Sequence, residues 1–131
     1  MPETQVDFFQ EADGRSPVLE WLLELRRADV AAFANCLYVL AALRRFGHEL
    51  RRPVADYVRD GIYELRARRG RVQYRLLYFF HGRNVSIVAH GLTKEDVVPP
   101  ADILRALQRK RRFESAPEAH RARSPKGLSD G

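Results

Sequence analysis

Three short apolar runs between residues 62 and 91 dominate the hydrophobic pattern of the chain. They cover residues 62–68, 73–80 and 85–91, are rich in Ile, Leu, Val, Tyr and Phe, and are separated by turn signals around Gly70 and Gly82. Apolar runs of this length with glycine turns between them are typical of consecutive antiparallel strands joined by hairpins. The pattern therefore predicts a three-stranded antiparallel sheet in the middle of the chain.

Helical patterns stand on both sides of these strands. Ser16 followed by proline is a favoured helix start, and apolar residues repeat at helical spacing after it as far as residue 27. Asp29 is a good N-cap for a second helix, and Gly47 is a natural residue to end it. A last helix is predicted over residues 100–112, where prolines open the apolar stripe. The sequence therefore predicts two helices before the sheet and one after it.

The predicted element order is β-αα-βββ-α. An apolar patch at residues 6–9 is interpreted as an edge strand, and residues 48–59 as an irregular connector, because Pro53 interrupts regular structure. This order predicts an α+β fold in which a small antiparallel sheet packs on two N-terminal helices with a C-terminal helix. Residues 1–113 are assigned to one domain, and residues 114–131 are expected to be a disordered basic tail, because Ser, Pro, Ala, Gly and charged residues dominate there.

Positive charge is concentrated in the middle and at the end of the chain. The net charge of +6 is composed of −4 over residues 1–43, +6 over residues 44–75, −1 over residues 76–104 and +5 over residues 105–131. The second of these segments holds ten arginines, and a guanidinium group can donate two parallel hydrogen bonds to phosphate oxygens. Charge alone thus favours a nucleic acid ligand over the alternative, a basic surface without a ligand.

The cysteine count and the hydropathy exclude several classes of protein. Cys36 is the only cysteine, so no internal disulfide is possible, and its place in an apolar helical pattern predicts a buried residue in a reducing compartment. Cys and His are not spaced as in zinc sites, and no metal or cofactor is expected. No apolar run reaches the roughly 18 residues of a membrane span, and the acidic N-terminus does not resemble a secretory signal. A cytoplasmic protein is therefore expected.

Three stretches of the chain together resemble one protein family. They are residues 60–82, DGIYELRARRGRVQYRLLYFFHG, residues 88–94, VAHGLTK, and residues 99–113, PPADILRALQRKRRF. This combination resembles the RelE/ParE toxin superfamily and is most similar to its HigB-like, phage-derived branch. The Tyr-Glu-Leu-Arg and Gln-Tyr-Arg motifs within the first stretch and the His-Gly-Leu-x-Lys ending of the second are specific only in combination.

The resemblance implies a function and leaves alternatives open. Members of the superfamily are toxins of type II toxin–antitoxin systems that enter the ribosomal A site and cut mRNA, and a small antitoxin, often a helix-turn-helix protein of the HigA type, neutralises them. The resemblance therefore implies an endoribonuclease with mRNA, the ribosome and a cognate antitoxin as partners. The related ParE toxins act on DNA gyrase instead, so a gyrase inhibitor is one alternative. A phage protein that binds RNA or a partner without chemistry is another.

Three residues are candidates for catalysis of RNA cleavage. Attack of a 2′-OH on the adjacent phosphate needs a proton acceptor, a stabiliser of negative charge and a proton donor for the leaving 5′ oxygen. By resemblance, Arg75 contacts the scissile phosphate, although a salt bridge with Glu64 is the structural alternative. Lys94 matches a basic position of the family, but two acidic residues follow it here. His90 has an imidazole suited to proton transfer, and is equally well explained as a hydrogen-bonded strand histidine.

Five further residues are candidates for RNA binding. The strand period places Arg66 and Arg68 on one face, where they could hold flanking phosphates. Arg69 and Arg71 lie at the predicted hairpin tip and point toward rRNA or solvent. Tyr78 could stack on an extruded base, although alternation along its strand favours a place in the core.

Overall fold

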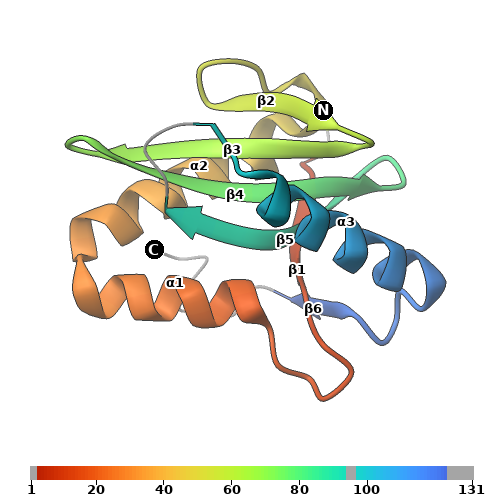
Figure 1. Ribbon diagram of the computed structural model, residues 1–131. Helices are drawn as coiled ribbons and strands as arrows, with labels where there is room; N and C mark the ends of the chain where they lie inside the picture. The colour runs from red at the N-terminus through yellow and green to blue at the C-terminus, as the bar shows by residue number, and fades with distance from the viewer. Residues whose placement is uncertain (1–2, 94–96, 124–131) are drawn as a thin grey trace.

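The structure, a computed structural model, describes residues 3–93 and 97–123 and has an α+β fold (Figure 1). Its helices are α1 (Pro17–Ala28), α2 (Val30–Phe46) and α3 (Pro100–Ser115), with a short 3-10 turn, η1 (Gly47–Glu49), after α2. Its strands are β1 (Gln5–Phe9), β2 (Ala55–Arg59), β3 (Ile62–Arg69), β4 (Val72–His81), β5 (Val85–Thr93) and β6 (Arg121–Arg123). The two predicted helices before the sheet and the one after it are confirmed, as is the α+β class.

All six strands form one sheet in the order β2-β3-β4-β5-β1-β6. The predicted hairpins β3–β4 and β4–β5 are confirmed as antiparallel pairs. The sheet is mixed, however, because β1 pairs with β5 in the parallel direction, from Gln5 opposite Val85 to Phe8 opposite Val88. The sheet is therefore larger than the predicted antiparallel sheet, and it is mixed because β1 lies parallel to β5, a strand about 80 residues later in the chain.

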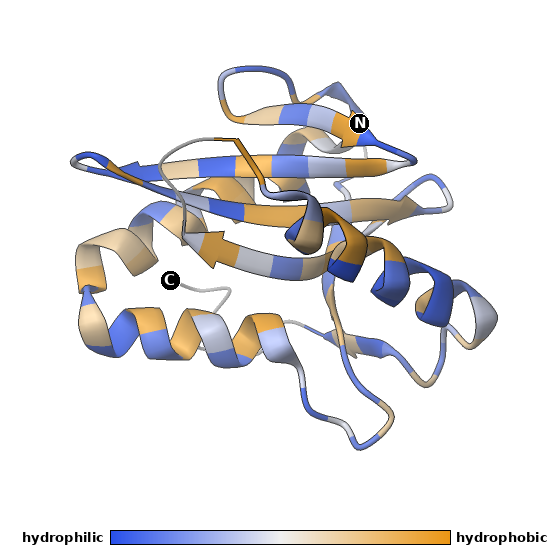
Figure 2. Ribbon diagram, in the orientation of Figure 1, coloured by the Kyte–Doolittle hydropathy of each residue, from blue (hydrophilic) through white to orange (hydrophobic). Residues whose placement is uncertain are grey.

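Helices cover both faces of the sheet. The side chains of β3, β4 and β5 alternate, so that Leu65, Leu76 and Val88 pack toward α1 and α2. The opposite face, which includes Leu77 and Phe79, packs toward α3. Figure 2 shows apolar colour along the middle of β4 and hydrophilic colour at the free end of the β3–β4 hairpin. The central strands are thus apolar on both faces only where helices cover both faces.

Two segments that were predicted to be irregular are strands at the edges of the sheet. Residues 48–59, interpreted as a connector, contain β2, which pairs with β3 through a tight turn at Asp60 and Gly61, whose φ angles are 52° and 83°. At the other edge, β6 pairs with β1 in a region expected to be disordered. An ion pair from Arg121 to Asp7, which is 1% exposed, holds β6 in place. Of the residues assigned to the tail, 114–115 therefore lie in α3 and 121–123 in β6.

The glycine at position 91 sets the distance between α1 and the sheet. A Cβ atom at Gly91 would lie 2.6 Å from Cε3 of Trp21, which is closer than carbon atoms can approach. Glycine therefore lets the indole ring pack directly on β5.

The continuous helical stretch Val30–Glu49 is long and apolar enough to cross a membrane by length and composition alone. Packing also accounts for its hydropathy, because six residues on one side of α2 are buried in the core: Ala32, Phe33, Cys36, Val39, Leu40 and Leu43. The predicted buried state of the single cysteine is confirmed, and burial raises the pKa of its thiol to about 12.

Candidate functional site

α3 covers only part of its face of the sheet. Its Asp102 contacts His90, which pairs with Leu77 of β4, and its Phe113 packs on Phe79 with ring centroids 5.4 Å apart. The β4 residues nearer the hairpin, from Arg75 back to Val72, lie beyond these contacts. Part of the sheet face is thus left without a helix over it.

A hollow of about 410 Å³ occupies this uncovered region. The residues that line it come from β3, β4 and the segment before β2: Pro53, Val54, Arg66, Ala67, Arg68, Gln73 and Arg75. In the sheet register Arg66 lies opposite Arg75, and Arg68 lies opposite Gln73. The prediction that Arg66 and Arg68 share one face is confirmed, and the hairpin register brings Arg75 to the same face.

A buried carboxylate joins two of these arginines. Glu64, which is 5% exposed, accepts a hydrogen bond of 2.5 Å from Nε of Arg66 and one of 3.4 Å from Nη1 of Arg75. Nη2 of Arg66 also lies 3.2 Å from Oδ2 of Asp56. The salt-bridge alternative for Arg75 is therefore present in the structure, and Arg66 is held on two sides.

Arg75 is nevertheless incompletely satisfied. Its side chain is 11% exposed, and its Nε is a buried donor without a hydrogen-bond partner among the described residues. A guanidinium group has five N–H donors, and the 3.4 Å contact with Glu64 is a long hydrogen bond. Burying an unpaired donor costs about 1–3 kcal/mol, so an anionic ligand at this position would relieve that cost.

The ion pairs leave an excess of positive charge in and beside the hollow. Two carboxylates, of Asp56 and Glu64, lie there among four guanidinium groups. These guanidinium groups belong to Arg52, Arg66, Arg68 and Arg75. The hydrogen bond from Arg52, aided by the Tyr57 amide and the charge of Arg66, lowers the pKa of Asp56 and keeps this carboxylate ionised. An added phosphate would therefore face net positive charge although it must share the arginines with carboxylates.

His90 lies under α3 and does not line the hollow. Its Nε2 is 2.6 Å from Oδ1 of Asp102, and its Nδ1 is 3.3 Å from Nη1 of Arg109, which also donates to the carbonyl of Ala89. Burial lowers the pKa of His90, while Asp102 partly opposes this shift. We assign a neutral ring that donates from Nε2 and accepts at Nδ1. The alternative of a hydrogen-bonded strand histidine describes His90, and the structure does not bring it together with Arg75.

Tyr78 is not accessible to a ligand. It is 1% exposed, belongs to the core on the α2 side, and stacks on Tyr63 with centroids 5.5 Å apart. Burial raises the pKa of its hydroxyl. Its assignment to RNA binding is wrong, because its position on β4 points it toward the helical pair.

The remaining predicted residues lie around the free end of the β3–β4 hairpin or outside the described residues. Arg68 and Arg71 are exposed. Arg69 is exposed as well, and its Nε lies 3.3 Å from Oδ1 of Asp29, which is the N-cap of α2. Lys94 and the two acidic residues after it lie outside the described residues, and the last described residues of β5 pair with Tyr74 and Arg75.

Asp56 and Gln73 belong to the hollow or its ion pairs but were not among the predicted site residues. Asp56 lies on β2, within the stretch interpreted as irregular. The Asp-Gly dipeptide at residues 60–61 is a strong hairpin signal and could have revealed that strand. Gln73 lies directly opposite Arg68 and could have been found from the hairpin register.

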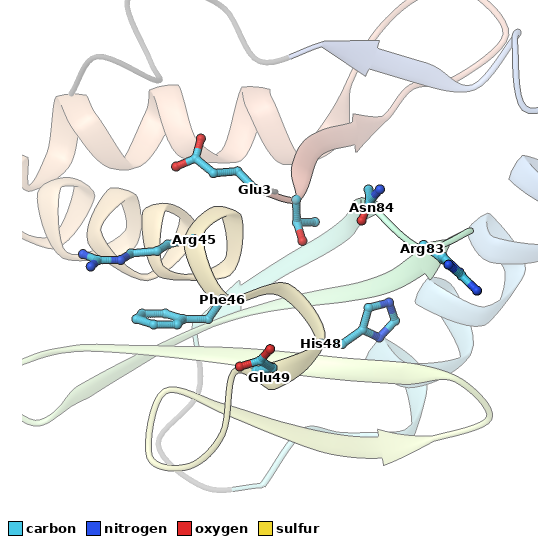
Figure 3. Close-up of a pocket in the computed structure, with 8 residues that line it drawn as sticks. Glu3, Arg45, Phe46, His48, Glu49, Arg83 and Asn84 are labelled. Atoms are coloured by element: carbon cyan, nitrogen blue, oxygen red, sulfur yellow. The ribbon is translucent and has the colours of Figure 1, made fainter. Parts of the chain in front are cut away.

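A separate hollow of about 470 Å³ lies near the end of α2 and the β4–β5 turn (Figure 3). It sets Arg45 and Arg83 against two carboxylates, Glu3 and Glu49. Because the charges balance, it favours an anion less than the hollow at Arg75 does. Across residues 3–93 and 97–123, no three His, Cys, Asp or Glu residues are grouped so that they could hold a metal ion.

Comparison with known proteins identifies a family. The model of the family described as Phage derived protein Gp49-like (DUF891) matches residues 23–111, which is more than half of the chain. The matched region runs from within α1 to within α3 and contains every residue that lines the hollow at Arg75. No curated protein matches the chain.

Proposed function

The chain belongs to the phage-derived Gp49-like family of RelE/toxin-like proteins, and on this basis we propose that it is the toxin of a type II toxin–antitoxin system. In this proposal it is a HigB-like endoribonuclease of the cytoplasm that cuts mRNA on the ribosome. A cognate antitoxin, of the helix-turn-helix HigA type, neutralises it.

The single observation that supports nuclease action most is the buried guanidinium of Arg75 in the positively charged hollow. Its Nε lacks a partner among the described residues, so a phosphate oxygen there would complete its hydrogen bonding. Arg66 lies opposite Arg75 and Arg68 is exposed beside them. The three guanidinium groups therefore suit one phosphate and its neighbours along an RNA strand.

The arrangement also suits the charge changes of RNA cleavage. The 2′-OH attacks phosphorus, the bond to the 5′ oxygen breaks, and a cyclic phosphate and a 5′-OH remain. Arg75 stabilises the negative charge that develops on the phosphate, since a guanidinium stays protonated throughout. Glu64 lies beside Arg75 and Arg66, where its carboxylate can accept the 2′ proton. Lys94 donates a proton to the leaving oxygen in this proposal.

Induced expression with transcript mapping tests the proposal. We expect the wild-type protein to arrest growth and to produce new transcript 5′ ends inside coding regions. Arg75→Ala should relieve the arrest, while Arg27→Ala, which changes an exposed arginine of α1, should stay toxic. Folding of both variants is checked by circular dichroism.

Two outcomes would contradict the proposal. Growth arrest with intact transcripts and DNA damage would indicate a gyrase inhibitor instead. Full toxicity of folded Arg75→Ala would show that the hollow is not the site of action.

A further inference from the structure

A further hollow, distinct from the one at Arg75 and the one at the end of α2, lies on the opposite face of the sheet, beside the edge strand β2. Its volume is about 530 Å³, and its walls include His48, Leu50, Arg51, Tyr57 and Tyr63. In the sheet register Tyr57 lies opposite Tyr63, on the face that α1 and α2 cover further along the strands. α2 ends at Phe46, before it reaches β2, so the face is open here.

Tyr57 presents a fixed and exposed aromatic ring in this hollow. The residue is 55% exposed, although tyrosine side chains usually bury most of their ring. Its hydroxyl accepts a hydrogen bond of 3.0 Å from the amide of Gly61, and its ring packs edge-on against Tyr63 with centroids 5.1 Å apart. Because both ends of the side chain are held, a planar ligand can stack on the ring with little loss of side-chain entropy.

Two arginines stand beside this ring. Arg51 donates from Nη1 to the carbonyl of His48 at 2.7 Å and to that of Leu50 at 3.3 Å, and makes no ion pair with a described residue. Arg52 is 76% exposed and lies 3.0 Å from Oδ2 of Asp56. Among the described residues that line this hollow, Asp56 is the single carboxylate, so the hollow combines an aromatic platform with excess positive charge. That combination fits a nucleotide, whose base stacks and whose phosphate is an anion.

We propose that this hollow at Tyr57 is a nucleotide-binding subsite for single-stranded RNA. In it, a base stacks on Tyr57, and its phosphate is bound by Arg51 and Arg52. This inference rests on the proposed function, because it names the place of a nucleotide that flanks the phosphate held at Arg75.

The ion pairs of Asp56 connect the subsite to the hollow at Arg75. Oδ2 of Asp56 lies 3.0 Å from Nε of Arg52, which lines the subsite, and 3.2 Å from Nη2 of Arg66, which lines the hollow at Arg75. Pro53 and Val54, which line the hollow at Arg75, stand in the chain between Arg52 and β2. An RNA strand that passes around this edge of the sheet would therefore meet both hollows in succession.

Binding of uncleavable RNA to the purified full-length protein tests the subsite. Two probes are used. The intact probe is a short fluorescent 2′-O-methyl oligonucleotide, which lacks the attacking hydroxyl, and the abasic probe is a matched oligonucleotide without bases. We expect Tyr57→Ser to weaken binding of the intact probe by about tenfold, as the loss of one stacked base predicts. Tyr57→Trp should keep the affinity. Wild type should prefer the intact probe over the abasic one, and Tyr57→Ser should lose much of that preference.

Tyr38→Ser is the matched control, because Tyr38 is an exposed tyrosine on α2, 74% accessible, outside both hollows. It should bind both probes as wild type does. Equal affinity of wild type and Tyr57→Ser for the intact probe, or absence of RNA binding by wild type, overturns the subsite. If transcripts are cleaved but Tyr57→Ser does not change RNA binding, the subsite is contradicted and the nuclease proposal stands. If RNA binding depends on Tyr57 but transcripts are not cleaved, the nuclease proposal is contradicted and the subsite stands.

Discussion

The two ends of one sheet face differ in what covers them. Under α3, β4 contributes Leu77 and Phe79 to a closed apolar core, whereas two residues before Leu77 the same face carries Arg75 in an open hollow. The strand, the pleat and the direction of the side chains are the same at both places. The position of α3 is what separates core from candidate site, and the difference teaches that a helix over only part of a sheet face leaves charged strand residues open to a ligand.

The first prediction concerns a mutation in the closed core under α3. Phe79→Ala should lower the free energy of unfolding by about 3–5 kcal/mol, because the side chain is fully buried and packs on Phe113. Chemical denaturation followed by circular dichroism measures this change. Arg75→Ala, at the open end, is the control and should change stability much less. Comparable losses in the two variants would contradict the separation of core and site.

The second prediction concerns the carboxylate beside the open hollow at Arg75. Glu64→Gln keeps the shape of a buried side chain but removes the negative charge between Arg66 and Arg75. We expect a loss of about 1–3 kcal/mol in stability, since two charged hydrogen bonds become weaker. Affinity for the uncleavable RNA probe should rise, because a phosphate no longer competes with a carboxylate, while transcript cleavage is lost.

Fluorescence anisotropy at several salt concentrations measures that affinity. Weaker binding of RNA by Glu64→Gln would mean that the carboxylate assists binding. Transcript cleavage by Glu64→Gln at the wild-type level would exclude Glu64 as the proton acceptor.

The third and smallest effect concerns the junction between α3 and the sheet. Burial lowers the pKa of His90 from its ordinary value of 6.5, so the unfolded chain takes up a proton at a higher pH than the folded protein. The contribution of His90 to the free energy of unfolding is therefore complete above about pH 6.5. It is lost as the pH falls from there through the lower pKa of the folded state. Protonation would also remove the acceptor at Nδ1 that faces Arg109.

Denaturation midpoints at pH 7.5 and pH 5.5 check this prediction. Wild type should lose more stability between these values than His90→Gln, which cannot take up the proton. Asp102 favours the charged ring and Arg105 and Arg109 oppose it, so the difference should be small. An identical loss in both proteins would show that His90 is not responsible.

The sequence predicted the site to a limited extent. Period-two alternation was enough to place Arg66 and Arg68 on one face, and the register of the β3–β4 hairpin in the structure adds Arg75 to that face. The sequence named Glu64 as an alternative partner of Arg75 but did not reveal that the same carboxylate also holds Arg66, because that depends on the side-chain distances in the folded sheet. It left two interpretations open for both Tyr78 and His90, and only the packing of the helices decided in favour of a core tyrosine and a hydrogen-bonded strand histidine.

Local rules were therefore sufficient for the elements made by neighbouring residues. Helix caps, apolar periods and glycine turns lie close together in the chain, and they determined three helices and the central hairpins. Tertiary structure alone decided the edges: β1 joins β5, and β6 is held by Arg121 and Asp7, whose positions differ by 114 residues. The reason is physical, because strand pairing and ion pairs between distant segments depend on where the whole chain places them, and no local pattern encodes that distance.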